Sequence, residues 1–204
     1  LDAYRQPLRE AFAAYGVPLF LAESRPCARR PLCECLLTAL QMVSRGARDE
    51  DLHACLASGC LDVSRRDAAR LRNYAVAYGL HASAFFRPLK RGPAELVEAL
   101  EPVRAAAMAP IAALRERLRA AKDLRGQLEA VFGFLTDIRA YDKSLARQQA
   151  LCAQDMYEAA GEEAQVWNRV IGALDQMAAL LGEKKLPARE IAERLAEALD
   201  AAVV

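Results

Sequence analysis

A mainly α-helical fold with about seven to nine helices is predicted by three features of this sequence. Apolar residues make up 54% of the chain but aromatic residues only 6%, and helix-favouring Ala, Leu, Arg and Glu are abundant. Apolar positions recur three and four residues apart, as on one face of a helix. Glycine and proline stand where these stretches end or begin. We therefore expect one irregular multi-helix domain over residues 1–204, whose candidate internal boundary is residues 80–92.

The N-terminal segment combines a helix with the one stretch that has a strand-like pattern. A helix over 3–15 would be capped by Asp2 and stopped by Gly16. Residues 17–22 then form a short apolar run with Pro18 at its beginning or edge, which suits an extended strand. A lone strand cannot make a sheet, so it would pair outside the chain or lie against the helices. The expected buried side of the first helix consists of Leu8, Ala11, Phe12 and Tyr15.

Two helices with clear start and stop signals are expected next. Pro31 opens the first, and Gly46 closes it. Asp49 would cap a short helix that ends near Ala57.

The following helix runs from Ser64, whose hydroxyl can cap the exposed amides, to Gly79, which can adopt the left-handed conformation that closes a helix. One face of this helix is apolar and the others are rich in arginine. The apolar face comprises Leu71, Tyr74, Ala75 and Tyr78, and the arginines are Arg65, Arg66, Arg70 and Arg72.

The second half of the chain also has the pattern of helices. Pro93 starts a helix that Pro102 and Pro110 should each kink or restart, because proline lacks an amide donor. Asp123 can cap a helix that ends near Tyr141.

A long helical region is expected over 144–181, with Gly161 as the weak point that divides it. Pro187 opens the last helix. The apolar stripe of the long region comprises Trp167, Val170, Ile171, Leu174, Met177, Leu180 and Leu181, and that of the last helix Ile191, Leu195, Ala198 and Leu199.

Basic residues are concentrated in the first part of the chain. Residues 1–92 hold 14 basic against 9 acidic residues, whereas residues 126–204 hold 8 against 13. On the predicted helix 111–121, the side chains of Arg115, Arg119 and Lys122 share one face, which makes them the best candidates for contacts with DNA phosphates. An ordinary solvated face is the favoured interpretation of these three residues.

The segment 80–92 has no clear period. Its Phe85-Phe86 pair lies beside three further candidates for DNA contacts, namely Arg87, Lys90 and Arg91. Aromatic and basic residues together suit stacking of nucleic-acid bases, but two phenylalanines that pin a loop to a core would give the same pattern. The second interpretation is favoured, because exposed paired phenylalanines are rare.

No signature of catalysis, metal binding or membrane insertion is found. Neither glycine-rich phosphate-binding motif occurs, and His53 and His81 are the only histidines. The spacing of the cysteines does not match zinc or iron–sulfur sites, and Cys33 and Cys35, two positions apart on a helix, should point to different sides. We therefore expect reduced thiols in a cytoplasmic protein. The six cysteines are Cys27, Cys33, Cys35, Cys55, Cys60 and Cys152.

Three blocks of the sequence resemble the AddB (RexB) family, the B subunit of the bacterial ATP-dependent helicase/deoxyribonuclease AddAB. The first is Tyr15-Gly16-Val17-Pro18-Leu19-Phe20 followed by Pro31-Leu32. The second, Leu71 to Leu80, is similar to the family's Leu-Glu-Asn-Tyr element with its trailing Tyr-Gly-Ile. The third is the run from Glu158 to Trp167, which contains Gln165-Val166-Trp167, followed by Leu174-Asp175-Gln176. The residues matched as structural motif positions are Leu71, Asn73, Tyr74, Tyr78, Gly79, Gln165 and Trp167.

The sequence departs from the family pattern at three places, which bear on local contacts. Arg72 stands where glutamate is usual, Arg30 stands where histidine is common before Pro31, and Phe85-Phe86 lies near an expected tryptophan.

The resemblance implies that this chain is a fragment: a non-catalytic helical insertion, comparable to the 2B region of related helicases, of a protein that resects DNA double-strand ends in recombinational repair. It implies two partners, duplex DNA and the A subunit of the helicase/nuclease. The ATP, Mg and 4Fe–4S cofactors of the parent family would bind outside residues 1–204. The alternative is a free-standing helical interaction module that uses the Trp167 stripe and has no DNA role. An enzyme or metalloprotein that uses the cysteines is a third, less favoured hypothesis.

Overall fold

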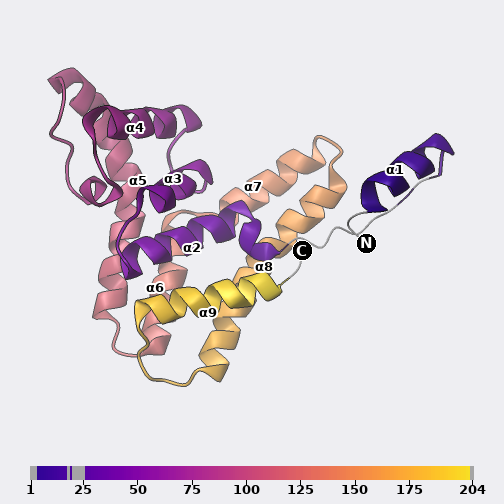
Figure 1. Cartoon of the computed structure of the whole chain (residues 1–204). Helices are drawn as coiled ribbons and strands as arrows, with labels where there is room; N and C mark the ends of the chain where they lie inside the picture. The colour runs from indigo at the N-terminus through magenta and orange to yellow at the C-terminus, as the bar shows by residue number, and fades with distance from the viewer. Residues whose placement is uncertain (1–3, 18, 20–25, 203–204) are drawn as a thin grey trace.

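The computed structural model describes residues 4–17, 19 and 26–202, apart from the side chains of Arg5 and Arg9. Over these residues the chain forms nine α-helices and two short 3₁₀ helices, and no β-sheet (Figure 1). The predicted mainly α, multi-helix fold is confirmed. The elements are α1 (Arg5–Ala14), η2 (Cys27–Arg29), α2 (Pro31–Ser44), α3 (Asp49–Ala57), α4 (Arg65–Tyr78), η3 (Ala82–Phe86), α5 (Ala94–Ala120), α6 (Leu124–Asp137), α7 (Ala140–Cys152), α8 (Tyr157–Leu180) and α9 (Ala188–Ala201).

The predicted strand over 17–22 falls largely outside the described residues. Only Val17 and Leu19 of this stretch are described, and neither has regular secondary structure.

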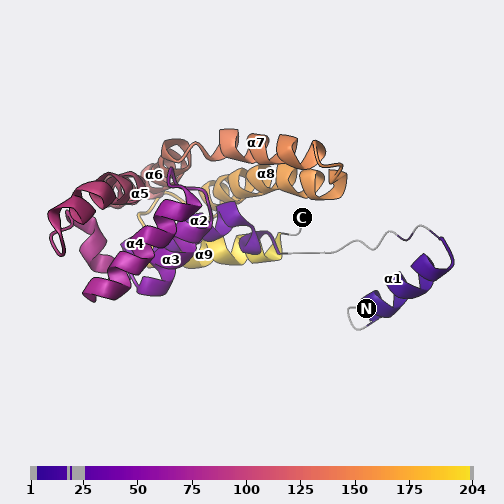
Figure 2. The same ribbon diagram turned by 90° about the horizontal axis from the view of Figure 1, so that it is seen from above.

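Helix α1 lies away from the other helices in both views (Figures 1 and 2). Gly16 ends it with φ 64°, as predicted, whereas the expected cap Asp2 lies outside the described residues. The prediction of a buried side is wrong for Ala11 and for Tyr15, which is 85% exposed. The periodic pattern identifies which face of a helix is apolar, but it does not identify what covers that face.

Helix α2 is the centre of the fold. It packs against α3, α5, α8, α9 and η2. Pro31 stands at its first position, where the missing amide costs no hydrogen bond. Leu36, Ala39 and Leu40 are completely buried in a core to which every helix from α2 to α9 contributes.

The termini of two helices follow the sequence signals. In α4, the Ser64 hydroxyl accepts a hydrogen bond from the Asp67 amide at 3.1 Å, and Gly79 closes the helix with φ 58°. In α6, the Asp123 carboxylate accepts from the Gly126 amide at 2.8 Å. Each helix therefore begins where a short polar side chain replaces a missing backbone acceptor.

The predicted cap of α3 is wrong. Arg48 occupies the cap position and makes no side-chain cap bond. The carboxylate of Asp49 instead accepts the Ala82 amide at 2.6 Å and contacts His81 Nδ1 at 3.0 Å. A tertiary contact with the start of η3 has thus replaced the local bond.

Helix α5 continues through both of its internal prolines, so of the two predicted outcomes, a kink or a restart, the restart does not occur. Each proline removes one donor, which costs about 3 kcal/mol in an isolated helix. Buried side chains between and after the prolines, including Met108, Ile111 and Leu114, hold this helix against the core and offset that cost.

The break in the long C-terminal region also differs from the prediction. Gly161 lies inside α8, and the chain turns instead between α7 and α8, where Asp155 adopts φ 57°. The Met156 amide donates to the Leu151 carbonyl at 3.0 Å, which gives the closing pattern that usually has glycine at the left-handed position. Of the expected stripe, Leu180 is 80% exposed, because it lies at the end of α8.

Candidate nucleic-acid interface

The C-terminal end of α5 carries two of the three residues predicted to form a phosphate-facing stripe. Arg115 and Arg119 lie on α5, but the helix ends at Ala120, so Lys122 lies in the connection to α6 and is exposed there. The prediction that all three share one helix face is therefore wrong for Lys122.

Arg115 and Arg119 line a pocket of about 320 Å³ together with Lys185, which comes from the connection between α8 and α9. Lys185 Nζ donates to the Arg119 carbonyl at 3.0 Å and to the Ala121 carbonyl at 2.6 Å. These carbonyls belong to the negative, C-terminal end of α5, which attracts a cation. The structure thus brings three cations together, and we refer to Arg115, Arg119 and Lys185 as the basic pocket.

The basic pocket has an excess of positive charge. Glu116 Oε1 lies 3.5 Å from Arg115 Nε and 3.3 Å from Arg119 Nη1. The Arg115 guanidinium also lies over the ring of Phe86, 4.5 Å from its centroid. Because one exposed carboxylate is shared between two guanidiniums and such pairs are weak, the pocket can still attract an anion.

Gln127 fixes the wall of the pocket that carries Lys185. Its Nε2 donates to the Leu186 carbonyl at 2.7 Å, and its Oε1 accepts from the Leu186 amide at 2.9 Å. Gln127 is 1% exposed. The connection between α8 and α9 is therefore held against α6 by two hydrogen bonds from a buried side chain.

The aromatic pair in the 80–92 segment serves packing. Phe85 is buried in the core, and Phe86 is half-buried beneath Arg115, so the favoured interpretation of a pinned loop holds. The candidates Arg87 and Lys90 are exposed and do not line the basic pocket, and Arg91 donates to the Tyr78 carbonyl at 2.8 Å.

The motif residues of α4 hold the helix in place. Leu71 and Tyr74 are buried, the rings of Tyr74 and Tyr78 lie 4.8 Å apart, and the Tyr74 hydroxyl donates to the Arg91 carbonyl. Asn73 is exposed, and Gly79 closes the helix.

One of the two motif residues of α8, Trp167, belongs to a group of aromatic side chains at the surface. Gln165 is exposed, while Trp167 is half-buried and contacts the rings of Phe132 at 6.5 Å and Tyr141 at 5.5 Å between centroids. We call Phe132, Tyr141 and Trp167 the aromatic cluster. Phe132 and Tyr141 are about half exposed.

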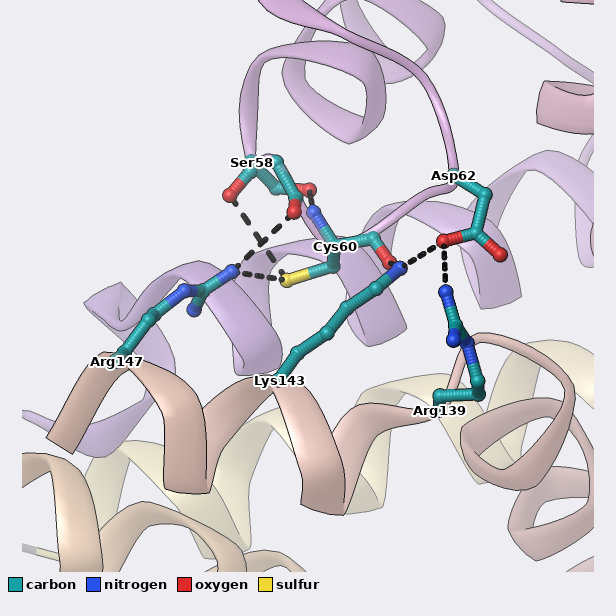
Figure 3. A network of polar contacts seen from close by, with 7 residues as sticks. Ser58, Cys60, Asp62, Arg139, Lys143 and Arg147 are labelled. Atoms are coloured by element: carbon teal, nitrogen blue, oxygen red, sulfur yellow. Dashed lines mark hydrogen bonds and ion pairs between the residues drawn. The ribbon is translucent and has the colours of Figure 1, made fainter. Parts of the chain in front are cut away.

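Three other basic residues have a structural role, for which the sequence offers no signal. Asp62 pairs with Lys143 at 2.8 Å and with Arg139 at 3.0 Å, and these partners lower its pKa (Figure 3). Lys143 also donates to the Cys60 carbonyl at 2.6 Å, and Arg147 to the Cys60 sulfur at 3.3 Å (Figure 3). These bonds join the α3–α4 connection to α7 and its N-terminal end.

Four cysteines form two buried thiol pairs. The sulfur atoms of Cys27 and Cys33 are 3.5 Å apart, and those of Cys35 and Cys55 are 3.6 Å apart. Cys33 and Cys35 therefore point to different sides, as predicted. The bond with the neighbouring thiol, and burial, raise the pKa of Cys33 and of Cys35, which favours the neutral form. Within the described residues, no group of three or more His, Cys, Asp or Glu side chains could hold a metal ion.

The fold and this surface define a mainly α, multi-helix domain with one basic pocket and one aromatic cluster. Among curated proteins, the chain is similar to several that are named as the B subunit of an ATP-dependent helicase/deoxyribonuclease. It is 30% identical to that of Geobacillus kaustophilus over 98% of the chain, 29% to that of Bacillus pumilus over 91%, and 26% to that of Alkaliphilus metalliredigens over 93%. The predicted resemblance to AddB is confirmed.

The chain spans only 18–19% of the length of these relatives. No family model matches the sequence. Among the helices that the structure describes, none combines the length and the apolar character needed to span a membrane.

Proposed function

We propose that this chain is a non-catalytic helical segment of the B subunit of an ATP-dependent helicase/exonuclease, which unwinds and resects DNA double-strand ends in recombinational repair. The observation that carries the proposal is similarity over 93% of the chain to proteins of that name, of which it spans about 18%. The segment would act in the cytoplasm as a scaffold along the path of the DNA.

The basic pocket is the surface we assign to duplex DNA. Arg115, Arg119 and Lys185 present three cations on the rim of one concave site, and phosphate groups are the commonest partners of such side chains on DNA. Lys122, in the connection that follows α5, is a candidate outer contact of this pocket. Arg87, Lys90 and Arg91 lie in the connection that precedes α5, so they are separate candidates for contacts with DNA.

The parent family's ATP, Mg and iron–sulfur cluster would bind elsewhere in the full-length protein. Within the described residues, no group of three or more His, Cys, Asp or Glu side chains could hold a metal ion, which does not fit a four-cysteine cluster.

The aromatic cluster is the surface we assign to the A subunit of the helicase/nuclease. Phe132 and Tyr141 are 48% and 54% exposed beside Trp167, and aromatic side chains are enriched in the centres of protein interfaces. The same cluster favours the second candidate function, a free-standing helical interaction module without a DNA role.

The test is the salt dependence of duplex binding. In fluorescence anisotropy with a duplex of about 20 base pairs, three phosphate contacts should contribute about 2.7 to the magnitude of the slope of log affinity against log salt. Replacement of Arg115, Arg119 and Lys185 by glutamine should remove this contribution to the slope. The matched control replaces three arginines outside the pocket, Arg125, Arg189 and Arg194, by glutamine.

Equal slopes for the two triple variants would refute the basic pocket as the DNA contact. If the chain itself shows no salt-dependent binding, the DNA role fails and the interaction module takes its place. Sedimentation then tests that module, because Phe132→Ser and Tyr141→Ser should dissociate an assembly that buries the aromatic cluster.

A further inference from the structure

A second concave surface lies between α3 and α4. It encloses about 270 Å³, with a floor that includes Leu56 and Ala68 and a rim formed by Arg65, Arg72 and His53. No carboxylate is among its described lining residues. We call it the α3–α4 groove, and it shares no lining residue with the basic pocket.

The two arginines of the groove are aligned and available. Arg65 and Arg72 are seven residues apart on α4, so they lie on one line of the helix, about 10 Å apart along its axis. Within the described part of the chain, neither forms an ion pair, whereas Arg70 on another face of α4 pairs with Asp67 at 3.2 Å. Both are exposed.

His53 also lines a second cavity of about 240 Å³, together with Leu52 and Val76. Val76 is 75% exposed. Asp49 and His81 also line this cavity, where they pair with each other at 3.0 Å. Positive charge is therefore concentrated in the α3–α4 groove itself, beside Arg65 and Arg72.

We propose that the α3–α4 groove binds a single strand of DNA, with phosphates on Arg65 and Arg72 and bases against the apolar floor. A single strand exposes the flat faces of its bases, which can cover Leu56 and Ala68. A duplex keeps these faces stacked inside and offers only its backbone. Charge complementarity and the apolar floor together therefore select the single strand. The inference rests on the proposed DNA role but uses a different surface.

The experiment measures binding of the full chain to a fluorescent oligothymidylate of about 15 nucleotides between about 50 and 200 mM salt. Two phosphate contacts on a single strand contribute about 1.4 to the slope, or about sevenfold in affinity over this range. Arg65→Gln with Arg72→Gln should remove that sevenfold change. The matched control, Arg66→Gln with Arg70→Gln, removes the same charge from other faces of the same helix and should leave most of the dependence intact.

A second probe separates base contacts from phosphate contacts. An abasic oligonucleotide of equal length keeps the phosphates but lacks bases, so it should bind more weakly than oligothymidylate at the same salt. Equal affinity for the two would overturn the proposal and leave an electrostatic surface only. Competition by poly-glutamate as strong as that by oligothymidylate would also overturn it, in favour of an acidic protein segment.

The duplex assay on the same variants distinguishes the two proposals. The groove assignment fails if Arg65→Gln with Arg72→Gln weakens binding to oligothymidylate no more than the control variant does. If duplex binding then still depends on the basic pocket, the proposed function stands. If neither nucleic acid binds with a salt dependence, both fail.

Discussion

Gln127 is the residue whose replacement tests the architecture of the basic pocket most directly. Its amide joins α6 to the connection between α8 and α9 through both backbone groups of Leu186, at 2.7 and 2.9 Å. Gln127→Leu keeps the approximate size and the apolar contacts of the side chain but removes both bonds. It leaves one backbone N–H and one C=O without their partner.

The expected loss of stability follows from these two groups. A buried polar group that loses its partner costs about 1–3 kcal/mol. Leu186 is only partly buried, so water can satisfy part of the demand. We expect Gln127→Leu to lower the free energy of unfolding by about 2–4 kcal/mol. The same change should weaken duplex binding, because Lys185 is next to the released residue.

Urea denaturation followed by circular dichroism measures this effect. With a slope of about 2 kcal/mol/M, the midpoint should fall by about 1–2 M. Gln149→Leu on the exposed face of α7 is the matched control and should change stability by less than about 0.5 kcal/mol. If the two variants unfold at the same urea concentration, the two bonds do not hold the connection and the reasoning is wrong.

Three further outcomes are expected. Gly92→Ala should destabilise the protein by about 1–3 kcal/mol, since Gly92 has φ 101° and a new Cβ would lie 2.6 Å from the Tyr78 hydroxyl; an unchanged melting temperature would contradict this. Gly161→Ala, inside α8 and facing open space, should instead stabilise by up to about 1 kcal/mol, and a lower melting temperature would show that the helix is strained there. The pKa of Asp62 is lowered, chiefly by Lys143, so its ion pairs stabilise the fold above the unfolded pKa of about 4, and this contribution is lost as the pH falls through the lower folded pKa. Urea titrations should therefore give Asp62→Asn a lower free energy of unfolding than the parent at about pH 7, by less than about 1 kcal/mol. The two free energies should converge below about pH 3. A difference that stays constant with pH would contradict the assignment.

Signals that act within one element could be predicted from the sequence. Ser64 and Asp123 each cap a helix through an amide three residues ahead, and Gly79 closes α4 with the predicted left-handed conformation. The core faces of α4 and α9 follow for the same reason, because three- and four-residue spacing determines which side chains share a face.

Features that depend on distant contacts could not be predicted. Asp49 has the sequence position of a cap, yet its carboxylate bonds to Ala82, 33 residues away. The break after α7 falls at Asp155 rather than at a glycine, because the closing bond to Leu151 and its surroundings outweigh the intrinsic preference. Sequence patterns at either place give no sign of these partners.

In the candidate site, too, residues on one helix could be predicted from the sequence, whereas a residue from a distant connection could not. Arg115 and Arg119 can be identified from their spacing on one helix, but Lys185 reaches the same pocket from 66 residues beyond Arg119. The Lys184-Lys185 pair after Gly182 is a visible signal of positive charge, although no periodicity links it to α5. Likewise, the sequence presents the groove arginines Arg65 and Arg72 only as part of a charged helix surface, since the cavity beside them requires α3.

The placement of the cysteines has a practical consequence for single-molecule work. Five of the six thiols are buried, and Cys152, at the end of α7, is the exposed one. A maleimide dye should therefore attach at one position in the native chain without any prior cysteine replacement. Energy transfer from that dye to labelled DNA would report which end of the domain the strand approaches, and so would orient the nucleic acid without a crystal of the complex.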